Sequence, residues 1–325
     1  MLQLLRVFAA GALACALSAC VIVDPGPKPK LGAWVERSSG TTSSLDKVIW
    51  TGTRFVAVGM NGTILTSSDG VTWSKQGFGI WRSVETVAVS DSGRLVAMMS
   101  DGVLLLSSDG LEWTEPPTDS TVRFASDIVW MNLSSDSGGG QFVAVGYDGK
   151  TATSPDGISW TVRPSGLTGD LYSVAWSGSM LAAVGRKGAS SAIVTSPDGV
   201  TWTEHVFETE GSVNSVVWSG TGFLAIGDPL LDGQCALFKS VDGTTWSVER
   251  VPAFGNLKFM ALAKAGGKVL AMGLDPKTGS SLLSSTDGLA WKTEISGYVG
   301  GFNAATGNGQ RSVVVGLSGE ILTSP

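Results

Sequence analysis

Histidine, tyrosine and cysteine are scarce in this sequence: its 325 residues include one histidine, three tyrosines and three cysteines. The single histidine, His205, has no second histidine or cysteine near it in the chain, so the spacing of a zinc site is missing. No Ser–His–Asp set can be placed either. Cys15 lies in the N-terminal leader, and Cys20 is the site of lipid attachment predicted below. Cys235 is then left without a partner in the sequence, which excludes a disulfide framework. We therefore expect no metal and no cofactor.

Basic residues are in the minority, with 22 Lys and Arg against 28 Asp and Glu and a net charge of −6. A general nucleic-acid binder would show a basic surface, so we expect no nucleic-acid partner. Helical periodicity is missing beyond residue 20, whereas 44 glycines separate many short apolar runs. This composition favours an all-β chain with many tight turns.

The N-terminus has the features of an export signal. One basic residue, Arg6, precedes the apolar run 7–19, which is shorter than the roughly 20 residues that span a bilayer. The run ends in Leu17-Ser18-Ala19-Cys20, which resembles the bacterial lipobox. The resemblance implies cleavage before Cys20 and acylation of that cysteine, which would anchor the mature chain to a membrane.

These features divide the chain into three parts. We predict a lipoprotein signal peptide at 1–19, a lipid-anchored, proline-rich tether at 20–30 and a folded domain at 31–325. Val21 follows Cys20, where lipoproteins kept in the inner membrane usually have Asp. The resemblance therefore favours the outer membrane of a bacterial cell envelope.

From residue 31 one unit is repeated along the chain. Six segments fit the pattern Ser-x-Asp-Gly-x-x-Trp, and the steps between successive tryptophans are 40, 47, 42, 44 and 45 residues. We call each of these segments a box. The box aspartates are Asp69, Asp109, Asp156, Asp198, Asp242 and Asp287. The box tryptophans are Trp73, Trp113, Trp160, Trp202, Trp246 and Trp291.

Each unit is long enough for four short strands. In the first unit, alternating apolar residues and Gly-containing turns predict strands at about 47–50, 55–59, 63–67 and 72–75. A period of 40–47 residues with four strands is typical of a propeller blade.

The two ends of the chain predict how the ring closes. The sequence stops at Ser324-Pro325, the start of a further box without its Asp, Gly and Trp. The missing strand is present at the other end, where Trp34 precedes Trp73 by 39 residues. We predict an all-β, seven-bladed β-propeller of four-stranded antiparallel blades, in which the N-terminal strand closes the last blade.

The boxes favour a structural role. A box Asp can accept hydrogen bonds from backbone N–H groups of its own turn, the Gly beside it can adopt a positive φ, and the Trp can pack between blades. The repeats resemble the Asp-box, or BNR-like, propellers, a group that includes sialidases and photosystem II assembly factors. The resemblance covers about residues 31–325, although these boxes are one residue shorter than the typical Ser-x-Asp-x-Gly-x-Thr-Trp.

The resemblance to sialidases implies an alternative function, a glycoside hydrolase or lyase that acts on an anionic glycan. That mechanism needs a Tyr nucleophile paired with a Glu, an acid/base Asp and three substrate-binding arginines. None of Tyr147, Tyr172 and Tyr298 lies in a sequence context that matches the nucleophile. We assign no catalytic residues. A pocket with arginines that converge on a Tyr–Glu pair would favour the enzyme.

Propeller topology places the loops opposite the boxes on one face. Tyr, Trp and Arg gather in these loops, and such residues are enriched at binding hot spots. The predicted binding residues are Trp81, Arg82, Arg123, Tyr172, Phe207 and Phe254. Arginines at the rim would orient an acidic partner. The favoured hypothesis is a non-catalytic envelope lipoprotein that holds a protein or glycan on this face as a binding or scaffold module.

Overall fold

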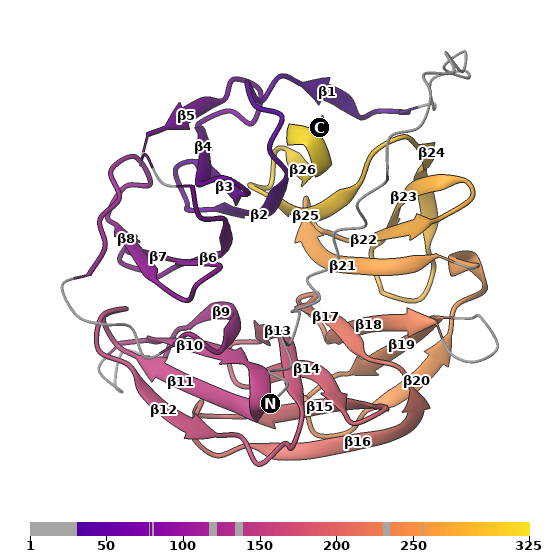
Figure 1. Ribbon diagram of the computed structural model, residues 1–325. Helices are drawn as coiled ribbons and strands as arrows, with labels where there is room; N and C mark the ends of the chain where they lie inside the picture. Colours follow the sequence, from indigo (N-terminus) through magenta and orange to yellow (C-terminus); the bar gives the residue numbers. More distant parts are fainter. Residues whose placement is uncertain are drawn as a thin grey trace, which may run out of the picture.

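A ring of seven antiparallel sheets forms the folded domain (Figure 1). The computed structural model describes residues 31–325, except 78, 80, 117–121, 134–138, 230–234 and 256. The predicted signal peptide at 1–19, the tether at 20–30 and the acylated Cys20 lie outside the described residues. No helix in the part described is long and apolar enough to cross a bilayer.

We number the blades from the first complete one, and the strands of each blade run outward from the centre of the ring. Blade 1 contains β2 (Leu45–Trp50), β3 (Phe55–Gly59), β4 (Thr63–Ser67) and β5 (Ser74–Gln76). Blade 2 contains β6 (Val84–Val89), β7 (Leu95–Met99) and β8 (Leu104–Ser107). Blade 3 contains β9 (Ala125–Met131), β10 (Gln141–Gly146), β11 (Lys150–Ser154) and β12 (Thr161–Pro164). Blade 4 contains β13 (Asp170–Trp176), β14 (Leu181–Lys187), β15 (Ser190–Ser196) and β16 (Thr203–Glu210).

The remaining blades complete the ring. Blade 5 contains β17 (Val213–Trp218), β18 (Phe223–Pro229), β19 (Cys235–Ser240) and β20 (Ser247–Arg250). Blade 6 contains β21 (Lys258–Ala265), β22 (Lys268–Asp275), β23 (Gly279–Ser285) and β24 (Lys292–Tyr298). Blade 7 contains β25 (Phe302–Gly307), β26 (Ser312–Gly316), β27 (Ile321–Ser324) and the N-terminal β1 (Val35–Arg37). Short 3₁₀ turns occur at η2 (Tyr147–Gly149), η3 (Pro252–Phe254) and η4 (Leu317–Gly319).

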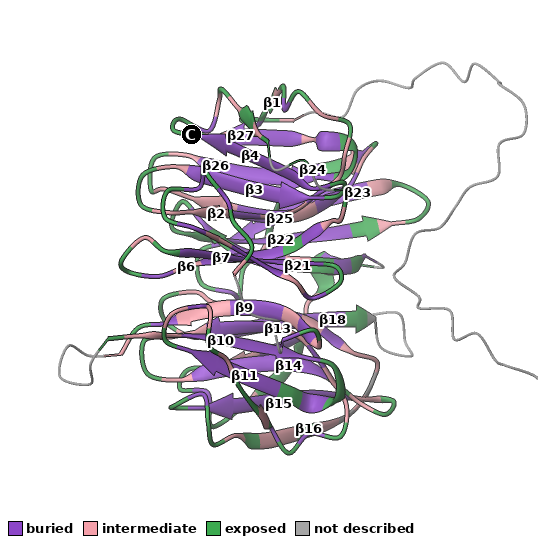
Figure 2. Ribbon diagram, turned by 60° about the vertical axis from the view of Figure 1, so that its left-hand side comes forward, coloured by how far each residue is buried: buried purple, intermediate pink, exposed green. Residues whose placement is uncertain are grey.

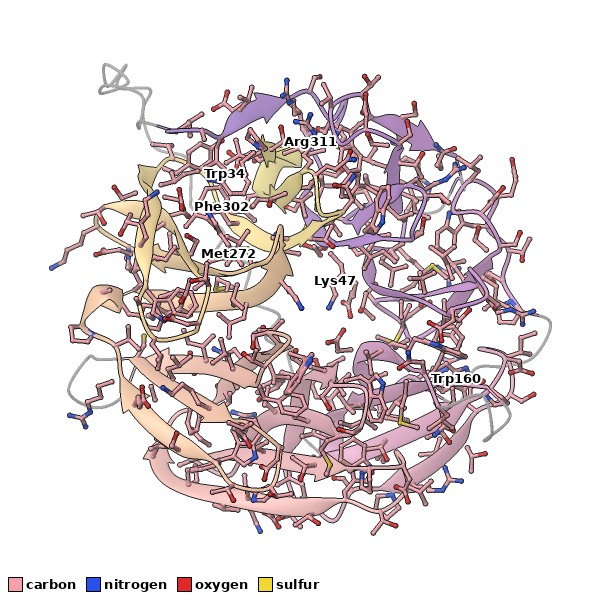
Figure 3. All side chains as sticks on the ribbon, turned by 180° about the vertical axis from the view of Figure 1, so that it is seen from behind. Trp34, Lys47, Trp160, Met272, Phe302 and Arg311 are labelled. Carbon is pink, nitrogen blue, oxygen red and sulfur yellow. The ribbon has the colours of Figure 1, made fainter. Side chains whose placement is uncertain are left out.

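The two ends of the chain meet in blade 7, which confirms the predicted closure. Strand β1 pairs antiparallel with β27, with Val35 opposite Thr323. Trp34 is 5% exposed and packs in the apolar cluster that contains Met272 and Phe302 (Figure 3). The N-terminal strand therefore covers the edge of β27, which would otherwise present unpaired backbone groups to other chains.

Blade 2 departs from the predicted four strands. Its outer strand is reduced to a single antiparallel bridge between Leu106 and Thr114. Pro116 follows almost at once, and a proline has no N–H with which to extend the ladder. The three-stranded blade is a correction to the regular repeat.

The apolar core lies between neighbouring blades. Seven separate clusters of buried residues each join two adjacent sheets. The cluster between blades 1 and 2, for example, joins Val56 and Ile64 to Val84 and Leu95. The second and third strands of the blades carry most of the buried positions, as the purple bands of Figure 2 show. Because both faces of these strands are covered, they read as continuous apolar runs rather than alternating ones.

Strand alternation sorts the connections onto two faces of the ring. The six boxes link the third strand of a blade to its outer strand, and they share a face with the hairpins that follow each inner strand. We call this the box face. The opposite face, which we call the loop face, carries the links between successive blades and the turns between second and third strands. The loops predicted for binding lie on the loop face.

Hydrogen bonds within each box hold its turn. In the first box, the Asp69 carboxylate accepts from the backbone N–H of Val71 and of Thr72, both at 2.8 Å. The Ser67 hydroxyl accepts from the Gly70 N–H at 2.8 Å, and the Trp73 indole donates to the Gly70 carbonyl at 3.1 Å. These contacts recur in the other boxes, except that the indole nitrogen of Trp202 is buried without a partner. This geometry is what a turn-stabilising carboxylate requires.

Candidate binding site at the channel mouth

Every inner strand contains a β-bulge near its start. In blade 1 the pairing with β3 shifts between Leu45 and Lys47, so Asp46 has no partner across the ladder. The other six blades show the same shift at the equivalent place. A bulge inserts one extra residue and re-aims its side chain. The residues left unpaired by the bulges are Asp46, Glu85, Ser126, Tyr172, Asn214, Met260 and Asn303.

A glycine lies opposite the bulge in six blades, and in all of these except blade 6 it lets the backbone approach closely. In blade 1 a Cβ placed on Gly59 would lie 2.0 Å from the carbonyl oxygen of Ser44, which no side chain could tolerate. Blade 2 has Met99 at this place. The bulges are thus a regular feature of the repeat. Each lies near the start of its inner strand, at the loop face.

The seven bulge residues line a cavity at the centre of the ring. Its volume is about 220 Å³, and the residues that follow each bulge line it more deeply. All seven inner strands contribute, and the lining is mostly polar around Lys47, Thr86 and Asp127, with an apolar side at Met260 and Ala261. Among the described residues that line the cavity, one is a tyrosine, Tyr172, and one is basic, Lys47.

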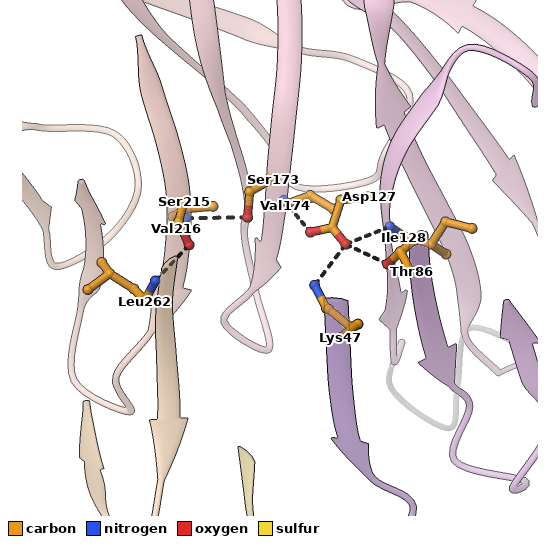
Figure 4. A network of polar contacts seen from close by, with 9 residues as sticks. All are labelled: Lys47, Thr86, Asp127, Ile128, Ser173, Val174, Ser215, Val216 and Leu262. Atoms are coloured by element: carbon orange, nitrogen blue, oxygen red, sulfur yellow. Dashed lines mark hydrogen bonds and ion pairs between the residues drawn. The ribbon is translucent and has the colours of Figure 1, made fainter. Parts of the chain in front are cut away.

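A polar network stitches the inner strands together deeper in the channel (Figure 4). The buried Asp127 carboxylate accepts from the Lys47 ammonium at 3.0 Å and from the Thr86 hydroxyl at 2.9 Å. Its second oxygen accepts from the Val174 N–H at 3.1 Å. In the next blades, the Ser173 hydroxyl accepts from the Val216 N–H in the same way. Figure 3 shows Lys47 projecting into the centre of the ring, where Asp127 balances its charge.

The bulge carboxylates at the mouth are not balanced in this way. Burial and the nearby charge of Glu85 raise the pKa of Asp46 to about 6. Partial desolvation by the surrounding cavity walls also raises the pKa of Glu85, although its side chain is exposed at the mouth. Among the ion pairs of the described residues, none includes Asp46 or Glu85. The Asn303 amide donates a hydrogen bond of 3.4 Å to the Asp46 carboxylate. The mouth of the channel is therefore acidic.

Solved structures place this ring among known propellers. The sequence matches no protein-family model and no curated protein. YCF48 from Cyanidioschyzon merolae superimposes with a TM-score of 0.68 at 18% identity, covering 90% of this chain and 98% of the other. A structure of YCF48 bound to D1 peptide gives 0.71 at 17% identity, with 92% and 98% coverage. A catalytically inactive virginiamycin B lyase from Staphylococcus aureus with quinupristin gives 0.70 at 8% identity, with 90% and 99% coverage.

The chain is a seven-bladed propeller of the same fold as YCF48. Identities this low carry the fold alone, and the fold serves both the peptide-bound YCF48 and a lyase. What the chain does must therefore be argued from its own residues.

Four of the predicted binding residues are accessible on the loop face or in the channel. Trp81 is 89% exposed in the link between blades 1 and 2. Tyr172 lines the cavity, and burial raises the pKa of its hydroxyl. Arg123 is exposed at the link into blade 3. The Arg82 guanidinium is held by Asp101 at 2.6 Å and by Glu115 at 2.8 Å, so its charge is already paired. The prediction that this arginine orients an acidic partner is weakened accordingly.

Two of the predicted binding residues are placed differently. Phe254 is 1% exposed, because the η3 turn folds its ring against Phe259 and Trp291. Phe207 is half-buried in β16 and packs edge-on against Phe238 at 5.0 Å. Phe254 is therefore part of the core rather than the surface, and its role in binding stays a prediction. The accessible members of the predicted set are therefore Trp81, Arg82, Arg123 and Tyr172.

The arrangement that a sialidase-like enzyme needs is not assembled by the tyrosines described. Tyr298 does lie beside two carboxylates, Glu320 and Glu36, which with burial raise its pKa. It is however 6% exposed, stacks on Phe302 and lies between blades 6 and 7, away from the cavity lining. Tyr172 does reach the cavity, but its charged neighbours are Arg186 and Asp170 rather than a glutamate. Among the described residues, no group of three His, Cys, Asp or Glu side chains is placed to hold a metal.

Proposed function

We propose that this chain is a non-catalytic binding or scaffold propeller that holds a protein partner on its loop face, around the channel mouth. The observation that carries the proposal is the bulge in all seven inner strands, which brings one side chain from every blade to one opening. A partner at that opening could contact several blades at once, and contacts on a rigid scaffold lose little entropy on binding.

Apolar side chains on the same face support a polypeptide partner. Trp81 and Val299 are both 89% exposed in links between blades, and Met260 is 56% exposed at a bulge. Large exposed apolar groups near a polar cavity are the anchors from which protein interfaces are built. The peptide-bound YCF48 shows that a propeller of this fold can hold a polypeptide, and it is consistent with the proposal.

The N-terminal sequence adds a location to the proposal. We infer from Leu17-Ser18-Ala19-Cys20 that the mature chain is a lipoprotein of the bacterial envelope, acylated at Cys20, with the outer membrane favoured. The tether at 20–30 would then let the propeller present its loop face to a partner near the membrane surface.

A matched pair of surface variants tests the binding face. The full-length chain, its Trp81→Ala/Val299→Ala variant and its Val241→Ala/Leu289→Ala variant would be used to capture partners from envelope extracts, with quantification by mass spectrometry. Val241 and Leu289 are 79% and 62% exposed on the box face, so the control also removes two exposed apolar side chains. We expect the loop-face variant alone to lose the captured partner, at unchanged melting temperature. Loss in the box-face variant alone would refute the proposal.

A further inference from the structure

The channel mouth has the charge to receive a cation rather than an anion. Asp46 and Glu85 are neighbours on the inner strands of blades 1 and 2, and no ion pair among the described residues includes either one. Lys47, the basic residue of the cavity lining, is paired with Asp127, and Arg82 in the link before β6 is paired with Asp101 and Glu115. Asp46 is partly buried and Glu85 is exposed at the mouth, and two neighbouring carboxylates without a counter-charge leave a site for one.

The size of the cavity limits what can enter it. Pockets that enclose small-molecule ligands typically measure roughly 300–1,000 Å³, whereas this cavity measures about 220 Å³. It suits one long side chain better than a whole ligand. Of the described carboxylates that line the cavity, Asp46 and Glu85 are the two without an ion pair, and they supply fewer oxygen ligands than the six or more that Ca²⁺ takes.

The surroundings of the mouth suit apolar residues on either side of that side chain. Exposed apolar groups lie on the loop face in consecutive blades, with Met260 and Leu274 in blade 6, Leu317 in blade 7 and Met60 in blade 1. Val299 lies in the link between blades 6 and 7. Blade 1 carries Asp46 on its inner strand, and blades 7 and 6 follow it on one side of the ring. The loop face therefore offers an acidic centre beside an apolar arc.

We propose that the channel mouth binds the ammonium or guanidinium group of a lysine or arginine in a partner polypeptide, with apolar residues next to it in the partner contacting the arc of Met60, Met260, Val299 and Leu317. This inference rests on the proposed binding function and adds the class of partner sequence. The cation replaces the water at Asp46 and Glu85 with charge-assisted hydrogen bonds, and the polar floor formed by Lys47 and Asp127 stops its entry further down the channel. Long aliphatic stems of Lys and Arg suit this path, because they pack against apolar walls while the charged end stays polar.

Peptide selection on the full-length chain tests the class of partner. A phage-displayed random peptide library would be panned against the purified chain, and the selected peptides resynthesised with each Lys or Arg replaced by norleucine. Affinities would be measured for the wild type, for Asp46→Asn and Glu85→Gln, and for Asp148→Asn. Asp148 also lies on the loop face, but its side chain is 78% exposed and its carboxylate pairs with Lys150, so it controls for the loss of one negative charge.

The expected result is a selection enriched in Lys or Arg beside apolar residues. Each channel variant should weaken binding about tenfold or more, as the loss of a charge-assisted contact does, whereas Asp148→Asn should leave it nearly unchanged. The norleucine peptides should bind wild type and Asp46→Asn equally, because the two changes remove the same contact. Peptides that depend on Trp81 and Val299 but not on Asp46 or Glu85 would overturn this inference and leave the proposed function standing. A selection that yields no peptide dependent on the loop face would overturn both.

Discussion

The Arg37 guanidinium Nε donates a hydrogen bond of 2.9 Å to the Thr323 hydroxyl, which joins two residues 286 positions apart in the chain. The bond crosses from β1 to β27, the pair of strands that closes the ring. This contact therefore lies where the N-terminal and C-terminal strands close the ring. The closure is non-covalent, because the described residues contain a single cysteine, the buried Cys235.

Trp34 directly precedes β1 and is buried in the apolar cluster between blades 6 and 7. Replacing Trp34 by Ala should lower the free energy of unfolding by about 3–5 kcal/mol, because a large ring leaves a cavity between blades 6 and 7. Urea unfolding followed by tryptophan fluorescence or circular dichroism would measure the change. The neighbouring Val35 is 46% exposed, so Val35→Ala is the matched control and should cost well under 1 kcal/mol. Equal losses for both variants would mean that β1 contributes little to closure.

The sequence was sufficient to predict the ring because the repeat is local. Each box places an Asp, a Gly and a Trp within one turn, so a pattern of seven residues reports a hairpin without knowledge of its neighbours. The split box at Ser324 and Trp34 then determined the closure, which the pairing of β1 with β27 confirms. The predicted strands of the first unit agree with β2 to β5 to within two residues at each end.

The candidate site was harder to predict because it depends on contacts between repeats. Tyr172 was predicted, but for its place in a loop rather than for the bulge that turns it into the channel. Asp46 and Glu85 were missed. Each follows an apolar residue at the start of an inner strand, and the second strand of the same blade ends at a Gly or a Met. Aligning the seven units would have put these polar residues in one column. Phe254 was predicted as a binding residue because it lies in a connection on the loop face, but the connection forms a 3₁₀ turn that buries the ring.

Lipid attachment at Cys20 is a prediction that labelling can check. Metabolic labelling with a palmitate analogue should mark the wild-type chain and not Cys20→Ser, which should also leave the membrane fraction or remain unprocessed. Cys235→Ser is the control, since Cys235 is buried and its thiol donates to the Leu257 carbonyl. A wild-type chain without label would refute the anchor.

The box aspartates should make the propeller sensitive to strong acid. Hydrogen bonds from the Thr72 and Val71 N–H groups hold the pKa of Asp69 at about 2, and the pKa values of Asp109 and Asp156 are lowered by their own turns. A lowered pKa in the folded state stabilises above the unfolded value near 3.8, and that stability is lost as pH falls toward 2. These carboxylates are largely solvated, so each contributes only about a few tenths of a kcal/mol to the free energy of unfolding.

A triple variant with Asn at these three boxes would isolate the contribution. Asn keeps a carbonyl acceptor for the turn but does not titrate, so the variant should be less stable than wild type at pH 7 and lose less stability between pH 4 and pH 2. Urea unfolding at both pH values measures the two slopes. Parallel losses in the two proteins would show that groups other than the boxes govern acid unfolding.

Asp46 should show the opposite dependence, as a residue kept for binding at some cost to stability. Its pKa in the folded chain is about 6 against an ordinary 3.8, so the folded state holds the proton more tightly than the unfolded state. Stability should therefore fall as pH rises from about 4 to about 6, and Asp46→Asn should remove that fall. The other titratable side chains of the cavity lining are Glu85, which raises the pKa of Asp46, and Lys47, Asp127 and Tyr172. At pH 7.5 we expect Asp46→Asn to be the more stable protein by about 1 kcal/mol, after allowance for partial exposure of the carboxylate, and to match wild type at pH 4.

Thermal or urea unfolding at the two pH values measures this, with Asp148→Asn as the exposed control. If Asp46→Asn instead destabilised the chain at pH 7.5, the carboxylate would be serving the contact with Asn303, and its place at the channel mouth would be structural.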